Sequence, residues 1–366
     1  MTKTSSLLPA LCGLLCALTL PAQPVHAVWP LGTNEFPDNV PGYGNLLLRF
    51  EPGVVKPIAA SLHMNFESTA AAVADSLGSP IFYTNGCYIA DAQGDTMPGS
   101  TGLSPGQMHD WTCPTTGYAS PKGAMILPWP DRPGQYVLLH MGIRYDPARK
   151  ITYGPLYWTA IDMNLNGGKG AVLSKNNLLL DGDLEPFATV RHANGRDWWV
   201  VLPQYGTARY HRFVLSPAGF GADEAQEIGP AMGCKRIGTS AFSPNGMRYG
   251  RQQNCQTTVL DFDRCSGEFS SPLVFNTAPY TFGGGGIGFS PDGSRLYTTS
   301  QLSVLEADLT QPNPKLDTLI FTYEYWQWGT SMGPLQQGDD LNLYIANMAR
   351  EKYYSRVRFG KADGSD

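Results

Sequence analysis

The chain has 366 residues and a formal net charge of −5, with 16% charged residues, 41 glycines and 29 prolines. The charged fraction lies well below the ~25% of ordinary globular domains, which argues against many solvent-facing helices, while glycine and proline favour turns. This composition predicts an all-β protein. Because the acidic charge is spread along the chain without blocks, it excludes a nucleic-acid partner and provides no attraction to an anionic membrane.

The first 27 residues have the pattern of a secretory signal peptide. Lys3 precedes an apolar run over residues 7–20, and the small-x-small exit Val25-His26-Ala27 follows. The run is too short to span a bilayer, and no later apolar stretch reaches that length. We therefore expect a signal peptide over residues 1–27 and a mature protein over residues 28–366 without membrane insertion. Its expected location is secreted, periplasmic or at the surface of a bacterial cell.

Five cysteines follow the signal peptide, and in an oxidising compartment some of them should pair. We expect the disulfides Cys87–Cys113 and Cys234–Cys255, with Cys265 left free. Cys255 and Cys265 flank the extended run TTVLDFD, which keeps their Cα atoms far beyond the ~7 Å limit for a disulfide. No close cysteine pair with the spacing of a zinc site exists.

A repeat dominates the second half of the chain. The frame F-S-P-[ND]-G-x-R occurs twice, and its glycines, Gly246 and Gly293, are 47 residues apart. Weaker copies surround Gly195 and Asp340, and residues 130–140 resemble the same unit. Asn-Gly and Asp-Gly supply the positive φ of a tight hairpin turn, and an apolar strand follows each copy. Short strands repeating every ~45–50 residues are typical of propeller blades, so we expect one β-propeller of about six or seven four-stranded blades.

Only two segments favour a helix. Residues 68–75, STAAAVAD, are alanine-rich, but they lead into the strand and turn PIFYTNG at 80–86, so we interpret them as part of a β-hairpin. Residues 221–228 are the other candidate.

These features together resemble a known family. Matching stretches are IFYTNG at 81–86, MPG at 97–99, IDMNLNGGKG at 161–170, WWVV at 198–201, VLDFD at 259–263 with Gly267, GFSPDGSRLY at 288–297 and residues 336–346. In this order they are similar to the secreted WD40-like, TolB-like propellers found in large surface proteins with a gliding-type (type IX) C-terminal sorting domain. Such proteins usually continue through further blades and the sorting domain. The resemblance therefore implies either a ring that closes within this chain or a shortened member.

Several chemical motifs are better explained by turns and strands. Gly329-Thr-Ser-Met-Gly333 fits a nucleophile elbow, but all six histidines precede Ser331 and a β-turn is expected there. The glycine-rich run at 283–288 lacks the helix that a dinucleotide site needs, and residues 162–167 lack the final glutamate of a calcium loop. Asp181, Asp183 and Glu185 place three carboxylates within five residues and are the candidate metal ligands, although a polar loop explains them as well.

The remaining candidates lie on loops and one aromatic strand. His109, Asp110 and Trp111 fall in a long irregular stretch, residues 94–122, that a compact blade does not need. His109, Asp110, Asp131 and Arg144 are the candidate catalytic residues, and Trp111, Trp326 and Trp328 are the candidate ligand-binding aromatics. Trp326 and Trp328 would form a stacking platform if exposed, or pack between blades if buried.

Because no paired catalytic groups stand out, the sequence favours an exported, non-catalytic binding module over an enzyme, with no cofactor. Its expected ligand is an extracellular protein or a polysaccharide. The alternative is a propeller-fold glycan hydrolase or lyase whose site lies on loops over the central channel. A purely structural part in a larger surface assembly is a third interpretation.

Overall fold

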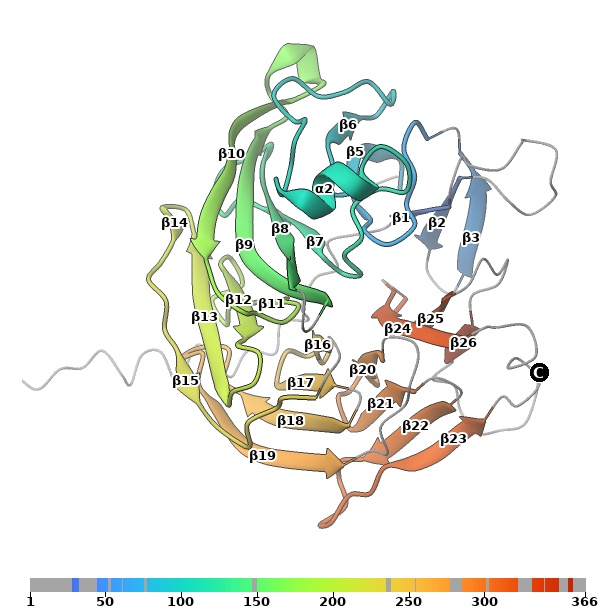
Figure 1. Cartoon of the computed structure of the whole chain (residues 1–366), viewed down its shortest axis with the longest axis vertical. Helices are drawn as coiled ribbons and strands as arrows, with labels where there is room; N and C mark the ends of the chain where they lie inside the picture. The colour runs from blue at the N-terminus through green and yellow to red at the C-terminus, as the bar shows by residue number, and fades with distance from the viewer. Residues whose placement is uncertain are drawn as a thin grey trace, which may run out of the picture.

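A computed structural model describes residues 28–32, 45–51, 54–60, 62–75, 78–146, 150–234, 238–253, 255–276, 285–300, 303–321, 331–338, 340–348 and 355–357. The expected signal peptide, residues 1–27, lies outside the described residues, as do Trp326 and Trp328. Within the described residues the strands form seven antiparallel sheets that follow one another in chain order around a ring (Figure 1). The expected all-β propeller is confirmed.

The strands of each sheet are consecutive in the chain. The first two sheets contain β1 (Val28–Leu31), β2 (Leu46–Glu51) and β3 (Val54–Ala59), then β4 (Ala71–Ala74), β5 (Pro80–Thr84) and β6 (Ile89–Asp91). The next two contain β7 (Ala124–Pro128), β8 (Gln135–Asp146), β9 (Lys150–Asp162) and β10 (Ala171–Leu180), then β11 (Ala188–Arg191), β12 (Trp198–Pro203), β13 (Arg209–Ser216), β14 (Gly219–Phe220) and β15 (Gln226–Glu227).

The second half of the ring continues the pattern. Its sheets contain β16 (Thr239–Phe242), β17 (Arg248–Gln253), β18 (Gln256–Phe262) and β19 (Phe269–Asn276), then β20 (Ile287–Phe289), β21 (Arg295–Thr299), β22 (Ser303–Asp308) and β23 (Asp317–Phe321), then β24 (Ser331–Gln337), β25 (Leu343–Met348) and β26 (Ser355–Val357). The first strands of neighbouring sheets contact one another, as β4 does β1 and β7, and β16 does β11 and β20. These first strands therefore lie innermost.

The ring closes by packing between its first and last sheets. Trp29 of β1 and Phe50 of β2 meet Tyr344 of β25 with ring centroids 5.6 Å and 5.5 Å away. All three aromatic side chains are buried in one apolar cluster. The closure therefore joins residues from the two ends of the described chain.

The F-S-P-[ND]-G copies form the hairpins that join the first and second strands of their sheets. Asn245 and Asp292 each accept a backbone N–H two residues on, at 3.0 Å in both turns. The two turns also contact each other, because Asn245 Nδ2 donates to the Asp292 carbonyl oxygen at 2.9 Å. The repeat thus links adjacent sheets as well as closing each hairpin.

Both segments with helix-like composition are extended. Residues 71–74 form β4 and pair with β5, which confirms the expected hairpin. Residues 221–228 contain β15 and no helix. The expectation of an irregular stretch over residues 94–122 is wrong in one part, because α2 (Gln107–Thr112) forms there. The other described helix is the single 3-10 turn η1 (Asn166–Gly168), and no helix among the described residues is long and apolar enough to cross a membrane.

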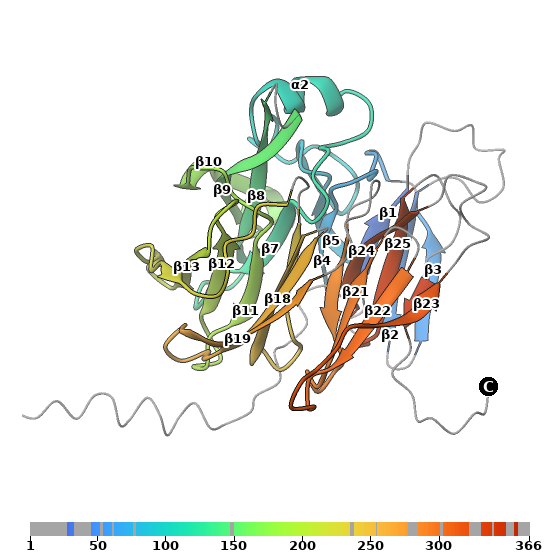
Figure 2. The ribbon, with the colours of Figure 1, turned by 60° about the horizontal axis from the view of Figure 1, so that its bottom comes forward.

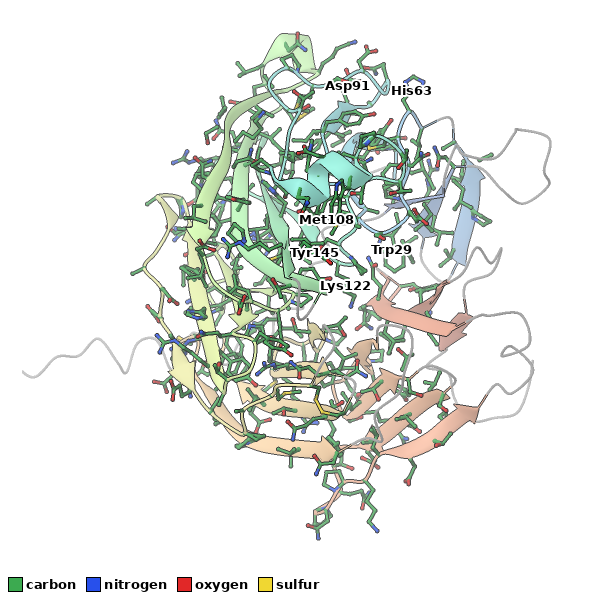
Figure 3. All side chains as sticks on the ribbon, in the orientation of Figure 1. Trp29, His63, Asp91, Met108, Lys122 and Tyr145 are labelled. Atoms are coloured by element: carbon green, nitrogen blue, oxygen red, sulfur yellow. A yellow bond between two sulfur atoms is a disulfide. The ribbon has the colours of Figure 1, made fainter. Side chains whose placement is uncertain are left out.

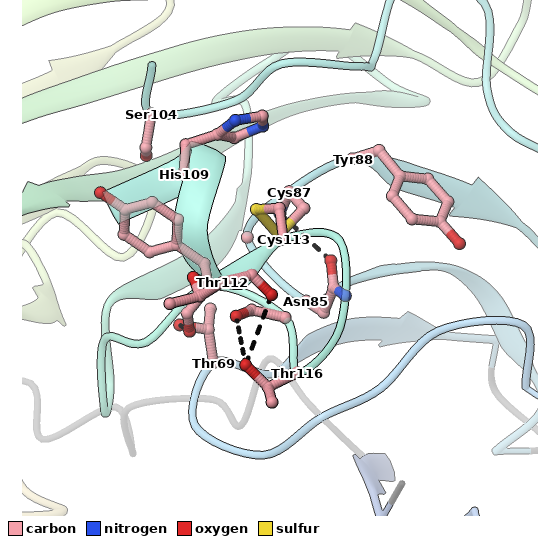
Figure 4. Close-up of a disulfide and its surroundings, with 12 residues drawn as sticks. Thr69, Asn85, Cys87, Tyr88, Ser104, His109, Thr112, Cys113 and Thr116 are labelled. Carbon is pink, nitrogen blue, oxygen red and sulfur yellow. Dashed lines mark hydrogen bonds between the residues drawn. A yellow bond between two sulfur atoms is a disulfide. The ribbon is translucent and has the colours of Figure 1, made fainter. Parts of the chain in front are cut away.

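Two disulfides have the expected pairing. Cys87 is bonded to Cys113, with Cα atoms 5.6 Å apart (Figure 4), and Cys234 to Cys255, with Cα atoms 6.0 Å apart. The expectation of a free Cys265 is wrong, because its sulfur is also disulfide-bonded. Such bonds are consistent with a protein that folds in an oxidising compartment.

Candidate active site near the ring axis

Several polar groups that could act on a ligand lie at one face of the ring. At this face the first, innermost strand of each sheet begins and the second strand ends, because the two strands are antiparallel. We call it the entry face and define it by Lys122 before β7, Glu185 before β11, Tyr145 near the end of β8 and Arg251 near the end of β17. The F-S-P-[ND]-G hairpins lie at the opposite face.

Lys122 is the unusual group of the entry face. It lies toward the middle of the ring (Figure 3), is partly exposed, and adopts a positive φ of 54°. Within the part of the chain that the structure describes, no hydrogen bond or ion pair engages its ammonium group. Burial lowers the pKa of Lys122 to about 8. A lysine with this pKa is present both as ammonium and as free amine near neutral pH, so it can donate or accept a proton.

The loop that carries Lys122 is held rigidly. Thr69 Oγ1 lies 2.7 Å and 2.8 Å from the carbonyl oxygens of Tyr118 and Ser120. Tyr118 Oη accepts the Ile143 N–H at 2.8 Å, and the Met141 N–H donates to the carbonyl oxygen of Gly123 at 2.8 Å. Strand β8 therefore fixes the loop on both sides of Lys122. Such preorganisation is what a catalytic group needs.

Two buried tyrosines, Tyr118 and Tyr153, stabilise this loop, and neither phenol ionises at neutral pH. Burial raises the pKa of Tyr118 to about 12. Burial also raises the pKa of Tyr153. Both phenols therefore stay protonated at neutral pH and cannot serve as bases.

Glu185 and Arg251 form a buried ion pair beside this loop. Arg251 Nε donates to Glu185 Oε2 at 2.9 Å and Nη2 donates to Oε1 at 2.6 Å, with side chains 0% and 2% exposed. Burial disfavours the charged guanidinium, but the Glu185 carboxylate outweighs this and raises the pKa of Arg251. Gln253 Nε2 donates to the same carboxylate, and Arg251 also donates to the carbonyl oxygens of Thr207 and Gln204.

This buried pair joins the segment before β11 to β17, so the Glu185 carboxylate is engaged in contacts that hold two sheets together. Because Glu185 is bound to Arg251, it does not join the other two candidate metal ligands, Asp181 and Asp183. Asp181 instead accepts from Arg144 Nη2 at 2.5 Å. No group of three metal-ligating side chains occurs in the described ranges, so Asp181, Asp183 and Glu185 do not assemble into a site there.

The four candidate catalytic residues do not meet. His109 and Asp110 lie side by side on α2, with Nδ1 and Oδ1 3.3 Å apart, and Arg144 lies near the end of β8 at the same face. Asp131 lies in the β7–β8 turn and pairs with Arg196 at 3.2 Å. The run of β8 from Gln135 to Arg144 is about 30 Å long, which separates Asp131 from the rest. The strand therefore places Asp131 and Arg144 on opposite faces of the ring.

Trp111 is 54% exposed on α2 and contacts Tyr145.

Sequence reasoning missed both Lys122 and Tyr145 as site residues. The available signal for Lys122 was its place at the end of a long loop directly before a strand, but nothing local predicts that its ammonium group stays unpaired.

The sheet ring and its polar entry face define a β-propeller. No protein-family model matches the sequence, and no curated protein does. Among solved structures, the chain is similar to the periplasmic gluconolactonase of Pseudomonas aeruginosa, at 12% identity over 87% of this chain and 88% of that one, with a TM-score of 0.51. Proteins assigned as 6-phosphogluconolactonases from Bacteroides fragilis and Bacteroides uniformis are also similar. They are 12% and 14% identical, cover 91% and 88% of this chain and 94% and 89% of their own, and have TM-scores of 0.51 and 0.50.

Identities this low show a shared fold. The propeller part of the family resemblance is thus confirmed, whereas the surface-protein and sorting-domain context stays a prediction. The expectation of a non-catalytic binding module is corrected by these comparisons, because the similar propellers are described as lactone hydrolases. These descriptions fit the hydrolase alternative better.

Proposed function

We propose that this chain is an exported hydrolase that opens sugar-derived lactones at the entry face, with Lys122 as its acid–base group. The observation that carries the proposal is a partly exposed lysine near the ring axis whose pKa is lowered to about 8 and whose ammonium group lacks an ion-pair partner among the described residues. Perturbed, unpaired titratable groups of this kind cluster at functional sites. The similar propellers described as lactonases support the choice of reaction.

The reaction requires only groups that this site and water supply. Neutral Lys122 Nζ accepts a proton from water as the water oxygen bonds to the lactone carbonyl carbon, which gives a tetrahedral oxyanion. The bond between the carbonyl carbon and the ring oxygen then breaks. The Lys122 ammonium returns the proton to the ring oxygen as it leaves, so the product is an open-chain hydroxy acid and Lys122 is regenerated. The product acid then ionises in water.

Export is part of this proposal. The signal-like pattern of residues 1–27 and the disulfides Cys87–Cys113 and Cys234–Cys255 support an oxidising compartment such as the periplasm. We further propose that the protein acts outside the bacterial cytoplasm on a substrate of extracellular origin, and fractionating cells that express the full chain tests this location.

Replacing Lys122 tests the activity. Lys122→Met keeps most of the side-chain volume and removes the amine, so we expect kcat/KM for glucono-1,5-lactone to fall by roughly 10²-fold or more. The rate is followed by pH-stat titration of the released acid, with spontaneous hydrolysis subtracted. Lys315→Met is the matched control, because Lys315 is exposed in the loop between β22 and β23, and it should leave the rate unchanged.

The pH dependence gives a second reading. Because the free amine is the base, kcat/KM of the unaltered protein should rise with pH through an inflection near 8, and the residual rate of Lys122→Met should lack it. Full activity in Lys122→Met would refute the assignment. So would the absence of any rate above the spontaneous one with five- and six-membered aldonolactones, with or without a 6-phosphate.

A further inference from the structure

An exposed aromatic pair lies at the entry face beside the proposed site. Trp111 of α2 and Tyr145 of β8 are 54% and 45% exposed, and their rings contact edge to face with centroids 6.0 Å apart and planes at 68°. We call these two residues the aromatic platform. Large aromatic side chains are mostly buried in proteins, so two exposed rings in contact need an explanation.

The platform is held in place by the surrounding structure. Cys113 caps the C-terminus of α2 and is bonded to Cys87, and Met108 of the same helix packs into the main apolar core (Figure 4). Figure 2 shows α2 projecting from the ring beside β8, the strand that it contacts. Tyr145 pairs with Ile151 in the β8–β9 ladder. Exposed rings that are fixed in this way lose little conformational entropy when a ligand binds.

Strand β8 relates the platform to Lys122. Met141 of this strand is hydrogen-bonded to Gly123, which follows Lys122, and Ile143 is hydrogen-bonded to Tyr118. Tyr145 is four residues beyond Met141, which is about 13 Å of extended chain. In the view of Figure 3, Tyr145 and Lys122 both lie toward the middle of the ring. A ligand that extends along β8 from the Lys122 loop to Tyr145 is therefore longer than a single sugar ring.

The chemistry of the platform suits a sugar. Its two contacting aromatic rings offer an apolar surface that takes the C–H face of a sugar ring. Charged side chains of both signs occur near this end of β8, where Arg144 and Asp181, each about half exposed, form an ion pair, and the Asp110 side chain of α2 is 77% exposed. This mixture of charges favours neither a polyanion nor a polycation.

We infer that the aromatic platform binds a sugar ring attached to the lactone, so that the substrate is an oligosaccharide ending in an aldonolactone. This inference rests on the proposed function for the position of the lactone. It assigns Trp111 and Tyr145 a role in substrate binding and none in the chemical step. It also explains why α2, an addition to the blade pattern, is tied to the ring by a disulfide.

The test compares substrates with one and two sugar rings. For Trp111→Ala and Tyr145→Ala, we expect KM for cellobiono-1,5-lactone and maltobiono-1,5-lactone to rise about tenfold, with kcat retained. KM for glucono-1,5-lactone should not change. Trp111→Phe should restore part of the affinity, and Leu178→Ala, which removes an exposed apolar side chain from β10, should behave as the unaltered protein.

A binding measurement separates this inference from the proposed function. Titration calorimetry with cellobionate and maltobionate, the open products, needs no turnover. Binding that is lost in Trp111→Ala and kept in Lys122→Met supports the platform even if the protein hydrolyses no lactone, in which case the proposed function alone fails. Hydrolysis of both disaccharide lactones with unchanged KM in Trp111→Ala, or no binding of either product by the unaltered protein, overturns the platform.

Discussion

Two cations at the entry face show how a single contact decides the role of a residue. Arg251 is fully buried, yet the bidentate Glu185 carboxylate keeps it charged, so the pair serves to join two sheets. Lys122 is more exposed but has no such partner in the described structure, and burial lowers its pKa to about 8. Because an unpaired buried amine destabilises the folded state, its presence is understandable where function requires it.

His140 is a third buried titratable group, and its partners show that it belongs to the core. Its Nδ1 lies 2.7 Å from Ser104 Oγ and its Nε2 lies 3.0 Å from Thr159 Oγ1. Burial lowers the pKa of His140 to about 3, so the ring is neutral in the folded protein at all ordinary pH values. A buried, hydrogen-bonded histidine is the ordinary structural role of this residue in a strand.

Acid should therefore weaken the fold through His140. Between pH 6.5 and pH 3 the unfolded chain binds a proton that the folded protein does not, so the free energy of unfolding falls as the pH falls. We expect a loss of about 2 kcal/mol from this group between pH 7 and pH 4.5. Urea unfolding at both pH values measures it. His140→Gln should be less stable at pH 7 but show a smaller drop at pH 4.5, and an equal drop in both proteins would contradict the assignment.

At the scale of elements, the hairpin copies act as connectors between sheets. Asn245 accepts the Met247 N–H within its own turn and donates to Asp292 in the next one. Arg248 adds a bond from its Nη1 to the Gly293 carbonyl oxygen at 2.9 Å. A repeated turn can thus position each sheet against its neighbour, which is how nearest-neighbour contacts stabilise repeat proteins.

Removing the Asn245 side chain should measure that connection. Asn245→Ala loses both bonds and a third that its Oδ1 accepts from Ser243 Oγ at 2.7 Å, and we expect it to lower the free energy of unfolding by about 1–2 kcal/mol in urea titrations. Met247→Ala is the control in the same turn, because this side chain is 58% exposed and its loss should change stability by less than ~0.5 kcal/mol. Equal effects of the two substitutions would show that the turn does not connect the sheets.

At the scale of the whole molecule, the ring depends on residues that are far apart in sequence. Trp29 and Phe50 belong to the first sheet and Tyr344 to the last, and the packing of these three side chains closes the propeller. Among the described residues, neither of these two sheets contains a strand from the other end of the chain. Such closure buries the faces of both terminal sheets. The ring is thus closed among the described residues.

Truncation of Tyr344 tests this closure. Tyr344→Ala leaves a cavity between the first and last sheets, and we expect it to lower the free energy of unfolding by about 3–5 kcal/mol. Tyr344→Phe keeps the ring and loses only the 2.7 Å bond from its hydroxyl to Asp340, so its effect should be near 1 kcal/mol. Denaturant titration compares the two variants. A similar small loss in both would mean that the aromatic contact does not hold the ring together.

Local sequence patterns determined much of this protein. The turn residues and strand spacing predicted the propeller and the Asn245 and Asp292 hairpins. Asn-Gly and Asp-Gly favour a tight turn by themselves, because they adopt positive φ readily. The PIFYTNG strand next to residues 71–74 outweighed the helix propensity of alanine. The two expected disulfides, Cys87–Cys113 and Cys234–Cys255, were also right, although sequence geometry had excluded only a Cys255–Cys265 bond.

Tertiary structure alone decided the site and the closure. Glu185 meets Arg251, Trp111 meets Tyr145 and Trp29 meets Tyr344 across separations that no turn or strand pattern encodes. The same applies to Lys122, whose pKa is lowered by burial that the surrounding structure creates. The sequence therefore determined the blades, through short-range backbone preferences, while long-range packing determined which side chains face one another at the entry face.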